Sequence, residues 1–178
     1  SYDDSEINHL PSIQIDKDTE MDVVQIATGA FSPLEGFMNE NDLYLVLDKM
    51  KLSSGCTWPL PIVLDVDKKD IDKISVDGEC LLTDYRNHPL ATLKVEQIYN
   101  NDKKVIVRAI YGTEDPQHPG VARFLSKKPF IIAGKLKLLN RRVSEMSQYE
   151  LTPLQLRKLF FEKGWEKIAG FHTRNVPH

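Results

Sequence analysis

The spacing of apolar residues over residues 10–139 predicts several short strands separated by turns. Apolar and polar positions alternate from Leu10 to Ile15 and from Ala91 to Ile98, as expected of strands with one buried face. Three further apolar runs also predict strands: Leu60 to Val66, Cys80 to Thr83 and Phe130 to Leu139. Within the last run, Gly134 is expected to mark a bulge or a close backbone approach.

Helical spacing interrupts this pattern of strands. Polar residues that can cap a helix precede two apolar faces, and the candidates are Thr19 or Asp22 and Asn41 or Asp42. The first helix would continue to Ile26 and the second to Met50. A short helix is also predicted from Ala122 to Lys127, whereas Asn101 to Tyr111 fits a strand and a helix equally well.

The turns between these elements carry two histidines and one apolar loop. Asp84 to Pro89 predicts a hairpin turn, in which His88 is a structural residue or, as a weaker alternative, a ligand or base. In the turn from Gly112 to Val121, the ring of His118 is expected to hold the backbone by hydrogen bonds. Gly29 to Met38 is too apolar to face water, so we expect a buried structural loop.

The last part of the chain has a different organisation. Residues 143–150 are polar and predict a linker, after which Thr152 caps a helix that Gly164 ends. Lys167 to Phe171 is predicted to be a short buried strand, followed at once by polar residues. In open α/β sheets ligands bind beyond the carboxyl ends of strands, so these residues are candidates for a nucleotide site. The alternative is a surface turn.

The polar residues after the predicted strand suit an oxyanion. Arg174 offers a planar two-pronged donor, Asn175 a neutral donor and acceptor, and His178 a ring that can donate to a phosphate.

Composition excludes several classes of function. The net charge of −3 argues against a general nucleic-acid binder, and 41% apolar residues are ample for a core. Cys56 and Cys80 are too far apart in sequence to form a CxxC pair, and no histidine lies at metal-ligand spacing from either of them. We therefore expect free buried thiols and no metal site. No apolar run is long enough to span a membrane and the start is acidic, which predicts a soluble, cytoplasmic protein.

The closing residues resemble a known motif. Residues 171–178, Phe-His-Thr-Arg-Asn-Val-Pro-His, are similar to the nucleotide-binding motif of ATP sulfurylase (sulfate adenylyltransferase), commonly Phe-Gln-Thr-Arg-Asn-Pro-x-His. Three other stretches look like amino-terminal signatures of that family: Gly29 to Met38, Trp58 to Val66 and Tyr111 to Val121. Four matches in the family's order identify the chain as a member.

The resemblance implies an α+β fold class: a small mixed β-barrel of the PUA-like type, then the first helix and strand of an α/β nucleotide-binding domain. It also implies a helix at 101–111. The expected domains are a flexible terminus at 1–9, the barrel at 10–142, a linker at 143–151 and the truncated start of the catalytic domain at 152–178.

The resemblance further implies that the intact protein joins ATP and sulfate to give adenosine 5′-phosphosulfate and pyrophosphate, without a side-chain nucleophile. Carried over by position, Arg174 holds sulfate and developing charge, Thr173 and Asn175 orient the α-phosphate, His172 contacts sulfate and nucleotide, and His178 faces the phosphates. Mg²⁺ would arrive with ATP, the intact enzyme would be a homo-oligomer, and no membrane or nucleic-acid partner is expected.

Two departures from the family pattern matter. His172 stands where the family usually has Gln, which makes the sulfate contact titratable near neutral pH. The family's second His and most of its catalytic domain would follow His178, so this chain alone is expected to be inactive. Two alternatives stay open: a stand-alone PUA-like binding or assembly module, and a fused adenylylsulfate kinase, for which these residues hold no phosphate-binding loop.

Overall fold

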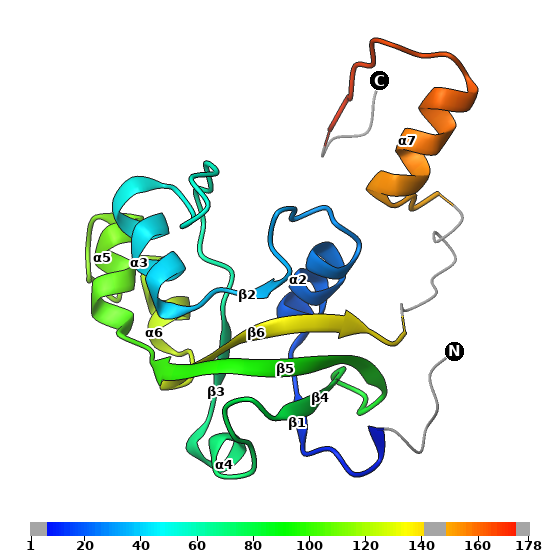
Figure 1. Cartoon of the computed structure of the whole chain (residues 1–178). Helices are drawn as coiled ribbons and strands as arrows, with labels where there is room; N and C mark the ends of the chain where they lie inside the picture. The colour runs from blue at the N-terminus through cyan, green and yellow to red at the C-terminus, as the bar shows by residue number, and fades with distance from the viewer. Residues whose placement is uncertain (1–6, 141–148, 174–178) are drawn as a thin grey trace. The chain divides into compact units, whose positions relative to one another are not determined.

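The computed structural model describes residues 7–140 and 149–173. The chain forms two compact units, Ser1–Arg142 and Val143–His178, and each is described by itself (Figure 1).

The first unit is built on one six-stranded sheet. Its strands are β1 (Ser12–Gln14), β2 (Gly36–Phe37), β3 (Leu64–Val66), β4 (Glu79–Thr83), β5 (Pro89–Asn100) and β6 (Phe130–Leu138). The strand order is β1-β4-β5-β6-β2, and β3 also pairs with β6. The β1–β4 pair is parallel and the other pairs are antiparallel.

The predicted β-barrel is wrong, because this sheet is open. Among the strands that the structure describes, β1 pairs with β4 alone, at one edge, while β2 and β3 lie end to end along the outer side of β6. Among the described residues no ladder joins β1 to β2 or β3. Closure requires the two edges to pair in a consistent stagger, and edge strands of three and two residues offer few hydrogen bonds for that.

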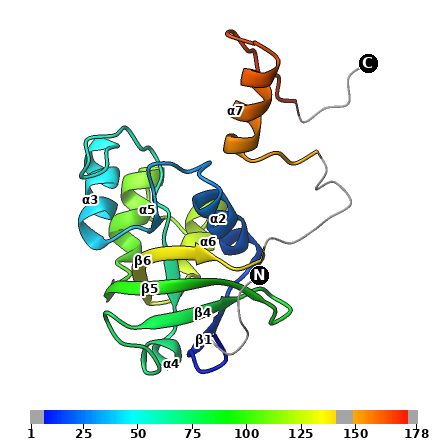
Figure 2. The ribbon, with the colours of Figure 1, turned by 45° about the vertical axis from the view of Figure 1, so that its right-hand side comes forward.

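The helices of the first unit include every helix that the apolar spacing predicts. They are α2 (Lys17–Ala27), α3 (Glu40–Lys49), α4 (Lys68–Ile71), α5 (Lys103–Tyr111) and α6 (Pro119–Leu125). The segment that fitted strand and helix equally is therefore helical. Figure 2 shows α5 beside α3, and the buried Ile106 and Val107 of α5 belong to the same core cluster as Leu43 and Val46 of α3.

The N-caps differ from the predicted residues. Asp16 caps α2 and accepts a hydrogen bond from the Thr19 N–H at 2.8 Å, and Asn39 caps α3 and accepts one from the Asp42 N–H at 2.8 Å. In both helices the predicted caps lie inside the helix. The cap is the residue whose backbone is still extended and whose side chain reaches three residues ahead, which composition alone does not reveal.

The core lies on both faces of the sheet. On β6, Ile132 packs in one buried cluster with Ile13, Val23 and Leu82. Its neighbours Ile131 and Ala133 belong to the second cluster, which the helices α3, α5 and α6 complete. Successive side chains of a strand point to opposite faces, so a continuous apolar run in β6 supplies both clusters.

The predicted close approach at Gly134 is confirmed. A Cβ atom built on Gly134 would lie 2.0 Å from the carbonyl oxygen of Lys94, and the β5–β6 register shifts between Val95 and Gln97 beside it. A Cβ atom on Gly36 would in turn lie 1.7 Å from the Gly134 carbonyl oxygen. Glycine at both positions therefore lets β2, β6 and β5 lie against one another.

Several predicted elements are confirmed only in part. The strand predicted at 60–66 is limited to β3, because Pro59 and Pro61 lack donors and Leu60 is 58% exposed. The loop from Gly29 to Met38 is split, with Phe37 and Met38 buried and Ser32 and Pro33 exposed.

Two further differences concern α6 and the cysteines. The α6 helix begins at Pro119 instead of Ala122 because His118 caps it. Both cysteines are free, but Cys56 is exposed and only Cys80 is buried. Among the described helices, none is sufficiently long and apolar to cross a membrane.

Candidate nucleotide-binding segment

The second unit begins with a strongly specified helix, α7 (Pro153–Glu162). The Thr152 N–H donates to Gln155 Oε1 at 2.8 Å, and the Gln155 N–H donates to Thr152 Oγ1 at 3.3 Å. Pro153 occupies the first turn, where its missing N–H costs nothing. The helix predicted to start at Thr152 and Pro153 is confirmed, because all of these signals are local.

The end of α7 is also well defined. Gly164 adopts a left-handed φ of 65°, and the Trp165 N–H donates to the Phe160 carbonyl at 2.9 Å. The rings of Phe160 and Trp165 lie 6.2 Å apart, and Lys163 Nζ lies 5.3 Å from the centre of the Trp165 ring. These contacts set the direction in which the chain leaves the helix towards residues 165–173.

The predicted strand from Lys167 to Phe171 is wrong. Residues 165–173 have neither helical nor strand structure, and all of them are exposed. A strand forms only where another strand supplies hydrogen bonds, and none of the described strands pairs with this segment. Several apolar side chains of the unit face solvent, with exposed fractions of 74% for Leu154, 88% for Phe161 and 88% for Phe171.

The structure describes two of the five predicted site residues. His172 and Thr173 are described and exposed. Arg174, Asn175 and His178 lie outside the described residues, so the predicted site remains a prediction.

Two of the three histidines of the first unit, His88 and His118, have structural contacts. The N–H of His88 donates to Asp84 Oδ1 at 2.9 Å and its ring nitrogen lies 3.3 Å from Asp84 Oδ2, inside the predicted hairpin turn. His118 Nδ1 accepts from the Val121 N–H at 3.3 Å and caps α6. The Tyr111 ring lies 5.1 Å from the His118 ring and against Gly120. The expectation that His118 ties down its turn is confirmed.

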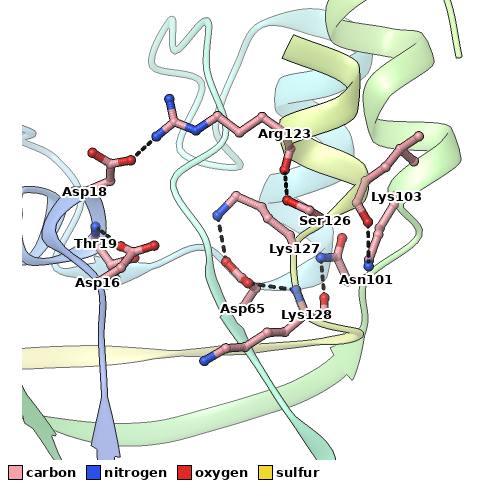
Figure 3. A network of polar contacts seen from close by, with 11 residues as sticks. Asp16, Asp18, Thr19, Asp65, Asn101, Lys103, Arg123, Ser126, Lys127 and Lys128 are labelled. Carbon is pink, nitrogen blue, oxygen red and sulfur yellow. Dashed lines mark hydrogen bonds and ion pairs between the residues drawn. The ribbon is translucent and has the colours of Figure 1, made fainter. Parts of the chain in front are cut away.

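A polar network in the first unit was not predicted from the sequence (Figure 3). Asp65 on β3 accepts from Lys127 Nζ at 2.7 Å and from the Lys128 N–H at 2.8 Å. The Asp65 side chain is 12% exposed. The signal in the sequence was a single charge within the apolar run from Leu60 to Val66, because a buried carboxylate is nearly always paired.

Among the described residues, no group of three or more His, Cys, Asp and Glu side chains is arranged to hold a metal ion.

Comparison with known proteins covers both units. Residues 3–141 match the family model of the PUA-like domain. The chain belongs to the PUA-like domain family. Residues 147–178 match the ATP-sulfurylase family model, so the resemblance of residues 171–178 to the motif of that family is confirmed.

Curated relatives span both matches. A sulfate adenylyltransferase of Staphylothermus marinus is 42% identical over 173 residues, 97% of this chain and 45% of the relative. One of Thermococcus onnurineus is 40% identical over 98% of this chain and 45% of its own length. A "probable bifunctional SAT/APS kinase 2" of Sorangium cellulosum is 38% identical over 95% of this chain and 29% of its length. The chain thus spans less than half the length of these relatives.

A solved structure shares the fold. The hexameric APS kinase from Thiobacillus denitrificans matches with a TM-score of 0.68 and 23% identity, over 90% of this chain and 28% of that one. At this identity the likeness concerns the fold alone.

Proposed function

We propose that this chain is the amino-terminal part of a sulfate adenylyltransferase, which converts ATP and sulfate to adenosine 5′-phosphosulfate and pyrophosphate. The observation that carries the proposal is the order of two family matches in one chain. A PUA-like match at 3–141 is followed by an ATP-sulfurylase match at 147–178, and relatives with that name align across both. The proposed boundaries are those expected from the sequence: 1–9, 10–142, 143–151 and 152–178.

The proposed site is the segment from His172 to His178. A sulfate oxygen attacks the α-phosphorus, and charge builds up on the phosphate oxygens and the leaving pyrophosphate. Arg174 neutralises that charge and holds sulfate, while Thr173 and Asn175 orient the α-phosphate. His172 and His178 contact sulfate and the phosphates. All these groups position the substrates or stabilise the charge that develops during the reaction, so the segment needs no activated Ser, Cys or Lys as a nucleophile.

The solvent exposure of the side chains in the second unit supports the proposal that these residues form only part of the active site. Helix α7 has no buried residue and residues 165–173 are all exposed. A pocket that excludes water must cover these side chains with other parts of a longer protein. Mg²⁺ enters bound to ATP, and the intact enzyme is a cytoplasmic homo-oligomer in this proposal.

The test is a substitution in the intact protein that contains this chain. Arg174→Ala should lower kcat by about 10² to 10³, the usual loss on removing one preorganised charge-stabilising donor, and Arg174→Lys should recover little because it lacks the planar fork. Arg157→Ala, at an exposed position of α7 outside the motif, is the matched control and should keep turnover close to wild type. Retention of more than about a third of the turnover by Arg174→Ala would contradict the assigned role.

A fused kinase is a second possibility that one relative favours. The Sorangium cellulosum protein carries both activities in its name and is longer than the other relatives, since the chain covers 29% of it instead of 45%. The full sequence of the parent protein decides this, because a kinase would add a glycine-rich phosphate-binding loop.

A further inference from the structure

A charged cavity of about 480 Å³ lies in the first unit between α2, β3 and the turn after α6. Its acidic side chains are Asp16, Asp18 and Asp22 on α2 and Asp65 on β3. Its basic side chains are Arg123 on α6 and Lys127 and Lys128 in the turn that follows. The Tyr111 ring of α5 also lines the cavity.

Three of the four carboxylates have defined partners. Asp16 caps α2, Asp18 pairs with Arg123, and Asp65 accepts from Lys127 Nζ and from the Lys128 N–H (Figure 3). Within residues 7–140 and 149–173, Asp22 makes no hydrogen bond or ion pair. It is nonetheless half-buried.

The spacing of the charges shows where a partner for Asp22 lies. Asp18 and Asp22 are four residues apart and share one face of α2. Arg123 and Lys127 are also four residues apart. Because Asp18 pairs with Arg123, the matching cation for Asp22 is Lys127, whose positive charge acts on the Asp22 carboxyl. Lys127 donates to Asp65 instead, so one ammonium group shares the cavity with two carboxyl groups, of which it is bonded to one.

We propose that Lys127 is a shared cation, held by Asp65 alone while Asp22 is protonated and drawn towards Asp22 once Asp22 is ionised. The contact between α2 and the turn from α6 to β6 therefore changes with pH. Ionisation of Asp22 strengthens the contact between α2 and this turn through Lys127, and it weakens the contact between β3 and the turn that Asp65 makes with the same lysine.

The electrostatics place this change near neutral pH. Burial is the main cause that raises the pKa of Asp22, to about 6, with Asp18 and Asp16 adding repulsion and Lys127 opposing it. The carboxyl is thus largely protonated below about pH 5 and largely ionised above about pH 7.

The experiment uses the whole 178-residue chain with ¹³C-labelled aspartate and ¹⁵N-labelled lysine. NMR spectra between about pH 4.5 and 8 follow the Asp22 carboxyl carbon and Lys127 Nζ. The Lys127 signal should move with the same midpoint as Asp22. In Asp65→Asn, Lys127 is free to pair with Asp22, so the Asp22 midpoint should fall by about 1 pH unit. In Lys127→Gln it should rise.

Lys128→Gln is the matched control, since it removes one positive charge from the next residue. It should move the Asp22 midpoint by less than half of the Lys127→Gln shift. A Lys127 signal that stays constant while Asp22 titrates would overturn the proposal, as would equal shifts in the two lysine variants. Should Asp65→Asn fail to fold, the pH dependence of the wild-type Lys127 signal and the two lysine variants decide the question alone.

Discussion

Gly134→Ala tests how closely three strands of the sheet are packed. The added methyl group would lie 2.0 Å from the Lys94 carbonyl oxygen and 2.9 Å from the Lys94 carbonyl carbon. Carbon and oxygen atoms ordinarily approach no closer than about 3.3 Å, so β5 and β6 would have to separate by about 1 Å. The Gly134 backbone cannot retreat, because Gly36 of β2 lies against its carbonyl oxygen on the other side.

The cost should therefore lie at the upper end of overpacking, about 3 kcal/mol in the free energy of unfolding. For a chain of this size that corresponds to a fall in Tm of roughly 6 to 12 °C. Urea unfolding followed by far-UV circular dichroism measures the change directly. The slope of the transition should stay the same, because both proteins expose the same surface on unfolding.

Alanine substitutions at two other glycines distinguish the free-energy cost of a steric clash from the cost of backbone strain. Gly29→Ala introduces a Cβ at a φ of 81° with no atom within 4 Å, and should cost about 1 kcal/mol from backbone strain alone. Gly170→Ala also meets no atom within 4 Å and has no positive φ, so it should change stability little. The packing argument fails if Gly134→Ala costs no more than Gly29→Ala.

Three further predictions concern titration and activity. Because the pKa of Asp22 is raised to about 6, the folded state loses stability as the pH rises from about 4 to about 6. Asp22→Asn should remove this loss, so the urea midpoint of the variant should increase relative to that of the wild type as the pH rises. A difference between the two midpoints that stays constant with pH would refute the prediction. His172→Gln in the intact protein should flatten the pH dependence of sulfate affinity, since a protonated ring attracts a dianion and an amide does not; parallel profiles would exclude the effect. The 178-residue chain alone should release no sulfate-dependent pyrophosphate above background, and a rate near about 1 per second would show that its pocket is complete.

The sequence was sufficient wherever the deciding contacts are local. The capping box at Thr152 and the left-handed Gly164 involve residues within one helical turn, and α7 was predicted with both ends. Alternation predicts β1 and β5, and a glycine inside the apolar run from Phe130 to Leu139 predicts a bulge or a close backbone approach at Gly134. The four family motifs likewise depend on consecutive residues.

The tertiary structure decided what depends on distant residues. The sequence could not show that the sheet stays open, because closure depends on whether strands at opposite edges pair. It predicted a strand at 167–171 from apolar content, yet a strand needs a partner that this segment does not have among the described residues. Lys127 and Asp65 are 62 positions apart, so only the fold brings them to 2.7 Å and places Asp22 in the same cavity as this paired cation. Spacing along a chain determines which side chains share a face, whereas the packing of that face against another element determines which charges meet.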